Sequence, residues 1–301
     1  MDIMPDRPAL LPEFNSVLYR ELHSDLAAFT AEEAKAHHAT FGIHEGRIAT
    51  FADTREGFLS EMVFKERGDI LEIGPDCAPA LDGASISYAE LLDASALRAR
   101  SRERGLNISC CPGKIDYPDG LGAIDRTFDT LFSSHVIEYQ PDLVGHLGMT
   151  SRLLAPGGRY YLIISDKRFC SDALLAESSI ADIVQAHCPP RQRHALATAI
   201  EQRALVTHND PVRHWANDHG SLDETVVRNQ IEATIRSYED GNDDFIDARA
   251  WRFTPAGFRK ILTILRLLKL IELAPVRIYN TPRDRQEFCV VLEDCASARS
   301  V

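Results

Sequence analysis

The chain has 301 residues, of which 45% are hydrophobic, so it can bury a large core as one big domain or as one domain with a small appendage. Its formal net charge of −12 disfavours nucleic acids and anionic membranes as partners, because both reward a basic surface. No segment approaches the ~18 apolar residues of a membrane span, and the amino-terminal residues lack the basic-then-apolar order of a secretory signal. The seven cysteines contain no Cys-x-x-Cys pair, which predicts reduced thiols and no zinc site; we therefore expect a cytoplasmic enzyme.

Residues 1–65 are expected to form a helical N-terminal module, followed by an α/β domain over residues 66–301. This domain begins with the stretch 69–75, in which Ile70, Leu71 and Ile73 form an apolar run typical of a central parallel strand. Gly74 permits a sharp turn at the carboxyl end of the strand, where open α/β sheets bind their ligands. Glu72 would be costly to bury without a partner, and a hydrogen-bonded adenosyl ligand would provide one.

The residues that follow Gly74 distinguish between two kinds of nucleotide ligand. A dinucleotide fingerprint would continue Gly-x-Gly-x-x-Gly, because its glycines let a pyrophosphate approach the backbone. Here the chain continues Pro75-Asp76-Cys77-Ala78, without a second glycine. The pattern therefore argues against NAD and favours a nucleoside ligand that has no phosphate.

Alternating strands and helices predict a parallel sheet built from βαβ units. Further strands are predicted over 85–88, 106–110, 128–134 and 159–165, with helices over 94–104 and 143–154 between them. Thr254 and Pro255 have the pattern of a helix start. One apolar face is predicted on that helix, formed by Phe258, Ile261, Leu262, Leu265 and Leu268.

Two last strands, near 271–279 and 287–292, predict a terminal antiparallel hairpin. Together these elements predict a doubly wound, mostly parallel sheet of seven strands. A helical insertion over 166–250 would form the substrate pocket and a lid. The insertion starts with Asp166-Lys167-Arg168, which would bind an anionic acceptor. Alternatively, Arg168 would only pair with Glu138 or Asp172.

The insertion contains a cluster of residues suited to chemistry, within the segment 207–220. Trp215 would stack on a sugar ring, while His214 and His219 would bond hydroxyl groups or supply a catalytic base. Two alternatives remain open. The segment would otherwise be a polar loop with capping residues, or a metal site, although the spacing of its histidines matches no strong zinc pattern.

Several motifs occur in an order known from one enzyme family. They are Leu71-Glu-Ile-Gly-Pro75, Tyr88-Ala-Glu90, residues 128–142 and residues 153–169. In these motifs the sequence resembles class I S-adenosylmethionine-dependent methyltransferases, which have a Rossmann-like fold. More narrowly, it is similar to those that modify bacterial surface polysaccharides and glycans, and the segment 14–47 looks like a short module often attached to glycan-assembly enzymes.

The resemblance implies S-adenosyl-L-methionine as the cofactor. It assigns cofactor contacts to Glu72, Gly74, Glu90, Asp116 and Ser134. In this interpretation Glu90 accepts hydrogen bonds from the ribose hydroxyls, Asp116 contacts adenine, and Ser134 lies beside the sulfonium. His135 is the first candidate for a general base, because the end of a central strand points into the ligand crevice. The alternative is that His135 only bonds the backbone and shapes the pocket.

Three positions depart from the family's pattern. Tyr139 and Arg249 each stand where a histidine is common, and Ser165 replaces a proline. We predict O-methylation of a sugar, a nucleotide sugar or a glycan end, with a small-molecule or glycan acceptor. The alternatives are a non-catalytic, methyltransferase-like scaffold of a glycan-assembly system, which Tyr139 and Arg249 favour, and a methyltransferase of secondary metabolism. The helical N-terminal segment is also a reasonable contact surface for a homodimer.

Overall fold

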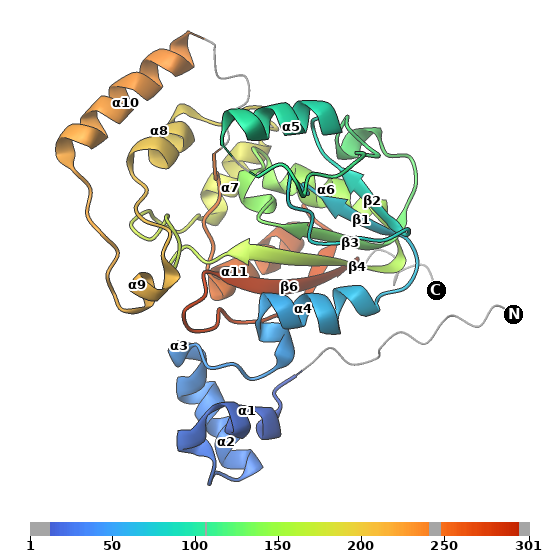
Figure 1. Ribbon diagram of the computed structural model, residues 1–301, viewed down its shortest axis with the longest axis vertical. Coiled ribbons are helices and arrows are strands. Elements are labelled where there is room, and N and C mark those ends of the chain that lie inside the picture. The colour runs from blue at the N-terminus through green and yellow to red at the C-terminus, as the bar shows by residue number, and fades with distance from the viewer. Residues whose placement is uncertain (1–12, 106, 241–247, 295–301) are drawn as a thin grey trace, which may run out of the picture.

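A six-stranded sheet forms the centre of the computed structural model, which describes residues 13–105, 107–240 and 248–294 (Figure 1). The strands are β1 (Ile70–Ile73), β2 (Ile86–Ala89), β3 (Phe128–Ser134), β4 (Leu154–Ser165), β5 (Leu273–Ile278) and β6 (Glu287–Asp294). Across the sheet their order is β2-β1-β3-β4-β6-β5. The first four strands run parallel, β6 runs antiparallel to β4, and β5 runs antiparallel to β6. The predicted α/β sheet and its terminal antiparallel hairpin are therefore confirmed.

The strand predicted over 106–110 does not form in the part of the chain that the structure describes, so the sheet there has six strands and not seven. Leu106 lies outside the described residues, and the residues after it form a turn. The Asn107 side chain accepts a hydrogen bond from the Ser109 amide at 2.9 Å, which stabilises a turn in place of a ladder. At the edge of β2, Ala89 instead forms a single parallel bridge with Tyr117.

The helices lie before the sheet, between its strands and in the insertion. They are α1 (Ser16–Leu22), α2 (Ala31–His37), α3 (Ile43–Glu45), α4 (Arg55–Glu61), α5 (Ala94–Glu103), α6 (Leu143–Leu153), α7 (Ile180–His187), α8 (Leu196–Ala204), α9 (Pro211–Trp215), α10 (Glu224–Glu239) and α11 (Pro255–Leu267). Within the described ranges, none of them combines the length and the apolar character needed to cross a membrane.

Local signals set the start of α11 as the sequence predicts. The Thr254 side chain accepts a hydrogen bond from the Gly257 amide, and Pro255 occupies the first helical position. Four of the five predicted apolar residues are buried, but Leu268 is 54% exposed. Its assignment to the buried face was wrong, because Leu268 is the residue that ends the helix and the chain turns away there.

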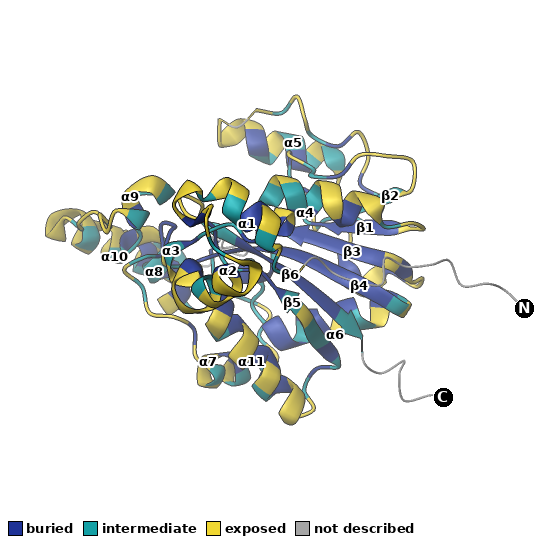
Figure 2. Ribbon diagram, turned by 90° about the horizontal axis from the view of Figure 1, so that it is seen from below, coloured by how far each residue is buried: buried dark blue, intermediate teal, exposed yellow. Residues whose placement is uncertain are grey.

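The strands of the sheet are covered on both faces, which explains their continuous apolar sequences. One apolar cluster joins Leu131 and Leu162 to buried residues of α6, α7 and α11. The other joins Phe132 and Ile163 to Phe58 of α4 and its neighbours. Figure 2 shows the buried strands between helices whose outer sides are exposed.

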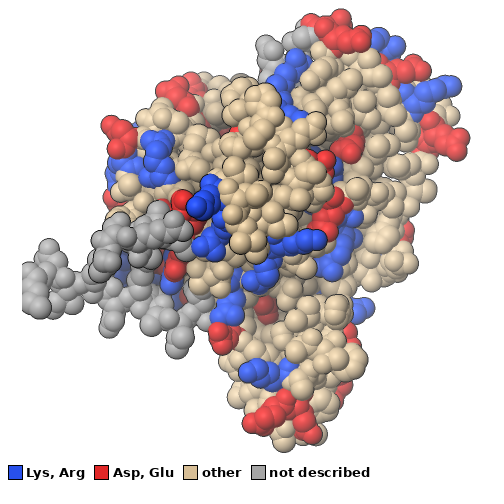
Figure 3. All heavy atoms as spheres, turned by 180° about the vertical axis from the view of Figure 1, so that it is seen from behind, with Lys and Arg blue, Asp and Glu red and all other residues tan. Residues whose placement is uncertain are grey.

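The insertion and the N-terminal helices extend from this layered core in Figure 1. Helices α8, α9 and α10 project beyond the end of the sheet towards which β4 points, and α1 and α2 lie apart from the strands. Figure 3, which shows the opposite face of the molecule, has acidic and basic side chains interspersed. The net negative charge is therefore not gathered into one patch on that face.

Candidate functional site

The strand order places a topological switch point at β1. The chain continues from β1 to β2 on one side, and then places β3 on the other side of β1. Open α/β sheets bind ligands in the crevice outside the carboxyl ends of the strands at such a point. Gly74 follows β1, Ser134 ends β3, and His135 comes directly after it. The fold thus brings these three predicted site residues to the carboxyl end of the parallel strands.

Gly74 is the residue that lets the loops after β1 and β3 approach each other. Its φ of 66° lies in the left-handed region, which side chains rarely adopt. A Cβ atom at this position would lie 2.6 Å from Cγ2 of Val136. The loops therefore meet closely, and a side chain at residue 74 would push them apart.

Glu72 is only 2% exposed, and protein groups bind both of its carboxylate oxygens. The Ala80 amide donates to one oxygen at 2.8 Å, and the Leu81 amide donates to the other at 3.0 Å. Burial raises the pKa of Glu72 to about 7. The partner that we predicted to be an adenosyl ligand is thus supplied by the backbone, and Glu72 holds the loop that follows Gly74. Its contact with a cofactor remains a prediction.

Glu90 and Asp116 lie at the end of β2, which neighbours β1. Glu90 directly follows the strand, its carboxylate accepts a hydrogen bond from the Leu91 amide at 2.8 Å, and burial raises its pKa. Asp116 accepts from the Tyr88 amide at 3.1 Å. Both acids are only partly exposed, and a backbone amide binds each of them. The Lys114 ammonium also pairs with Asp116.

A disulfide between Cys77 and Cys111 links the loop after β1 to the segment that precedes Asp116. The prediction of reduced thiols is wrong for this pair. The two residues are 34 positions apart in sequence, so their spacing gave no sign that the loops would meet. Among the other described cysteines, Cys110 and Cys188 are exposed, whereas Cys170 and Cys289 are buried.

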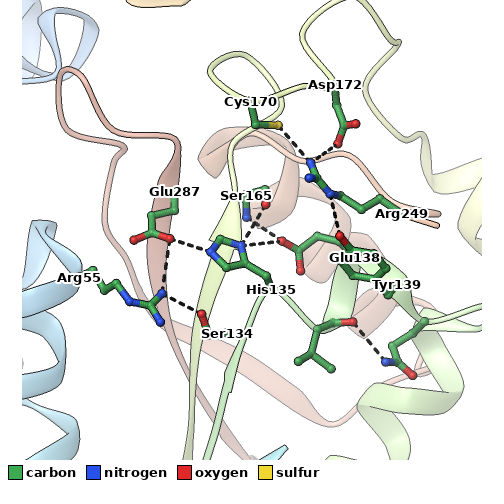
Figure 4. A network of polar contacts seen from close by, with 12 residues as sticks. Arg55, Ser134, His135, Glu138, Tyr139, Ser165, Cys170, Asp172, Arg249 and Glu287 are labelled. Atoms are coloured by element: carbon green, nitrogen blue, oxygen red, sulfur yellow. Dashed lines mark hydrogen bonds and ion pairs between the residues drawn. The ribbon is translucent and has the colours of Figure 1, made fainter. Parts of the chain in front are cut away.

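His135 lies between two carboxylates at the end of β3 (Figure 4). Its Nε2 is 2.7 Å from Glu287, and its Nδ1 is 3.0 Å from Ser165 Oγ and 3.5 Å from Glu138. Burial alone would lower the pKa of His135, but the hydrogen bonds to Glu138 and Glu287 raise it to about 9. The ring is then protonated at neutral pH. An imidazolium can donate protons, whereas the base that we predicted requires a neutral ring.

Arg55, at the start of α4, also reaches this cluster. Its Nη1 donates to Ser134 Oγ at 2.8 Å and lies 3.5 Å from Glu287. Figure 4 shows Arg55 and Glu287 on the side of His135 opposite to Glu138. Sequence reasoning missed Arg55 and Glu287, because they come from segments 79 and 152 residues away from the partners that they contact.

The two positions that depart from the family's histidine pattern contact each other. Arg249 Nε donates to Tyr139 Oη at 3.1 Å, and Arg249 Nη1 donates to Asp172 at 2.9 Å. Asp247, two residues before Arg249, lies outside the described residues. The two departures therefore form one paired contact beside His135 (Figure 4).

Arg168 does not pair with either of the acids that we predicted. It binds Asp166 through two hydrogen bonds, of 2.9 Å and 2.6 Å, because the chain turns directly after β4 and brings the two residues together. Asp166 is fully buried and also accepts from Thr281 Oγ1 at 2.6 Å. The Arg168 guanidinium thus neutralises a buried carboxylate, which favours a structural role over binding of an anionic acceptor.

His214 and His219 form a second group of predicted site residues, in and after α9. His214 is 2% exposed, and its Nδ1 is 3.0 Å from Nδ1 of His219. Burial lowers the pKa of His214. Trp215 stacks on Phe169 with ring centroids 3.9 Å apart, so Phe169 covers one of the two ring faces that we predicted for sugar stacking.

In the part of the chain that the structure describes, no hydrogen bond joins either lid histidine to His135. The same residues contain no group of three histidine, cysteine, aspartate or glutamate side chains that is arranged to hold a metal ion.

No protein-family model and no curated protein matches the sequence. Solved structures match at low similarity. A DhpI complex with S-adenosylhomocysteine (SAH) has 14% identity and a TM-score of 0.38, and the match covers 93% of this chain and 94% of that one.

Two further structures are similar to this chain. Magnesium protoporphyrin IX methyltransferase from Synechocystis PCC 6803, with bound SAH, has 11% identity and a TM-score of 0.36, with coverage of 79% and 78%. The CcbJ methyltransferase from Streptomyces caelestis has 9% identity and a TM-score of 0.37, with coverage of 76% and 90%. Because these scores and identities are all low, the likeness assigns neither a family nor a reaction to this chain.

Proposed function

We propose that this chain is an S-adenosyl-L-methionine-dependent methyltransferase that methylates a hydroxyl group of a sugar, a nucleotide sugar or a glycan end. The observation that carries the proposal is the topological switch point at β1, where Gly74 lets the loops after β1 and β3 meet closely and Glu90 follows the neighbouring strand β2. No phosphate-binding glycine loop follows β1, which favours a nucleoside ligand without a pyrophosphate.

The residues at the crevice fit the chemical groups of this cofactor. Glu90 and Asp116 are carboxylates at the end of β2, suited to hydrogen bonds from the ribose and adenine. Arg55 is a cation beside Ser134, suited to the carboxylate of the amino-acid end. When bound, the cofactor supplies a methyl group activated by a positively charged sulfur.

Within this proposal, the chain has three functional parts. The N-terminal module covers 1–65, the methyltransferase domain covers 66–301, and the insertion over 166–250 recognises the acceptor. His135, with both ring nitrogens engaged, positions Glu287 and Glu138 across the ends of β3, β4 and β6. Methyl transfer is an in-line displacement, so alignment of the acceptor with the methyl group supplies much of the rate.

A transfer assay tests the proposal. The wild-type protein is incubated with methyl-labelled S-adenosylmethionine and a panel of free hexoses, nucleotide sugars and oligosaccharides, and products are identified by mass spectrometry. We expect labelled product and SAH with at least one sugar. Cofactor binding without transfer to any panel member would favour the scaffold alternative, to which the Tyr139–Arg249 contact points. Absence of cofactor binding would overturn the proposal.

A further inference from the structure

Backbone partners fix which ring nitrogen carries the proton in two histidines of the insertion. His208 Nε2 lies 3.0 Å from the Asp218 carbonyl oxygen, so it donates, and its Nδ1 accepts from the Asp210 amide at 3.3 Å. His214 Nε2 lies 3.0 Å from the His208 carbonyl oxygen, so it also donates. A neutral imidazole has one donor and one acceptor nitrogen. Nδ1 of His214 is therefore an acceptor.

The tautomer of His219 follows from that of His214. The two Nδ1 atoms are 3.0 Å apart, and since His214 Nδ1 accepts, His219 Nδ1 carries the proton. The lone pair of His219 then lies on Nε2, for which the described residues offer no hydrogen-bond partner. The rings also stack, with centroids 4.1 Å apart for His208 and His214 and 5.2 Å for His214 and His219. One nitrogen is held and the other is free, which is the arrangement that a general base needs.

The segment that carries His219 packs against the carboxyl end of the parallel strands. The Thr207 amide donates to the Ser171 carbonyl at 2.9 Å, shortly after the end of β4. Trp215 stacks on Phe169, and its Nε1 donates at 3.0 Å to the carbonyl of Arg285, two residues before Glu287. His219 is thereby held on the same side of the sheet as the carboxyl ends of β3 and β4.

Charged groups near the cluster balance one another. Arg213 Nε donates to Asp218 at 2.8 Å, and Asp210 caps α9 through the Val212 and Arg213 amides. The titratable groups that face the histidines are therefore an ion pair, a capping carboxylate and the other two histidines. None of these groups forms a hydrogen bond with His219 Nε2.

We propose that His219 is the general base and that His214 and His208 position it, an assignment that rests on the proposed methyltransferase function. The acceptor hydroxyl oxygen forms the new carbon–oxygen bond, and the carbon–sulfur bond of the methyl donor breaks with its electron pair left on sulfur. The hydroxyl proton passes to Nε2 of His219 and then to solvent. The acceptor class is thus an alcohol with a proton to lose. His214 and His135 are not bases, because both nitrogens of each ring are engaged.

The tautomers are measured directly by ¹⁵N–¹H NMR of the histidine rings in the wild-type protein, with His219→Asn used to assign the His219 signals. We expect the proton on Nδ1 of His219, and on Nε2 of His208 and His214, at neutral pH. A His219 ring that carries its proton on Nε2 would overturn the assignment, whatever acceptor the enzyme uses.

Activity gives the second test. In His219→Asn the side-chain amide retains a donor for His214 Nδ1 but removes Nε2. We expect a ~10²–10³-fold lower kcat with unchanged SAH affinity. The matched control is His187→Asn, whose wild-type Nδ1 contacts Asp142 outside the cluster.

The outcomes separate the two proposals. Wild-type transfer to a panel sugar together with full activity of His219→Asn would overturn the assignment and leave the methyltransferase function standing. A wild-type protein that binds no SAH would overturn both. If the wild type binds SAH but methylates no panel member, the NMR measurement decides the assignment.

Discussion

The carboxyl ends of the parallel strands form two halves, β1–β2 and β3–β4, which are held together in different ways. At the ends of β1 and β2 the acids bind backbone amides close to them in sequence, 8 and 9 residues away for Glu72 and one residue away for Glu90. At the ends of β3 and β4, side chains bind partners far along the chain. His135 and Glu287 are 152 residues apart, Tyr139 and Arg249 are 110 apart, and Trp215 and Arg285 are 70 apart.

The difference indicates how each half is assembled. The contacts of Glu72 and Glu90 are local, although the β1–β2 half also contains the Tyr88–Asp116 contact and the Cys77–Cys111 disulfide, which span 28 and 34 residues. The β3–β4 half requires α4, the insertion and the terminal hairpin to dock at the same time. The stability of the β3–β4 half also depends on pH, because its central contact joins a charged imidazole to carboxylates.

The largest effect is expected in the locally built half, from Gly74→Ala. The substitution places a Cβ at a φ of 66° and 2.6 Å from Val136, so we expect the free energy of unfolding to fall by about 3 kcal/mol, together with loss of SAH binding. Denaturant unfolding measures this change in the free energy of unfolding. The control is Gly148→Ala in α6, where a Cβ would meet nothing within 4 Å, and where we expect up to ~1 kcal/mol of added stability. Equal stability of the two variants would contradict the close approach.

The ion pair of the other half should make stability depend on pH. Because the folded-state pKa of His135 is raised to about 9, its contribution is complete below an unfolded-state pKa of ~6.5 and is lost as pH rises through about 9. Its side chain is 32% exposed, so solvent screening reduces the expected loss to about 2 kcal/mol.

Thermal unfolding of the wild type and of Glu287→Gln between pH 6 and pH 10 checks this expectation. The variant removes the carboxylate closest to His135, so its midpoint should vary less with pH over this range. If the unfolding midpoints of the two proteins changed with pH in parallel, the His135–Glu287 pair would contribute nothing to the pH dependence of stability.

Docking of the insertion should weaken in Trp215→Ala by about 1–2 kcal/mol, because the stack on Phe169 and the hydrogen bond to the Arg285 carbonyl are both lost. Limited proteolysis measures the effect, which should appear as faster cleavage between α8 and α10. The unfolding of the sheet itself should change little. Unchanged cleavage would contradict the role of Trp215 as the fastening contact.

The smallest effect concerns the start of α11. Thr254→Ala removes the helix cap together with the hydrogen bond that the Thr254 hydroxyl donates to Glu177 at 2.6 Å, and should lower the unfolding free energy by about 1 kcal/mol. Thr263→Ala is the matched control, since this exposed threonine bonds only the carbonyl of Arg259 within the same helix, and it should be neutral or slightly stabilising. Chemical denaturation of both variants distinguishes the cap from a general effect of losing a threonine.

The same contrast explains what the sequence could predict. Phe128–Ser134 was predicted with the bounds that β3 has, because its apolar run and small flanking residues are local signals. The start of α11 was predicted for the same reason. The predicted strand at 106–110 fails because an edge strand depends on its partner, and here Tyr117 takes the place beside Ala89. Arg55, Glu287 and the Cys77–Cys111 disulfide have no local signal, since each joins segments that meet only in the folded chain.

The most direct test is calorimetric titration of SAH into the wild type, Glu90→Ala and the control Glu103→Ala, whose exposed carboxylate lies at the end of α5. We predict binding by the wild type and by the control, and an affinity weakened by ~1–3 kcal/mol in Glu90→Ala, because a carboxylate that accepts from the ligand is removed. Absence of binding in all three proteins would contradict a cofactor crevice at the switch point. Equal binding in all three would contradict its placement beside β2.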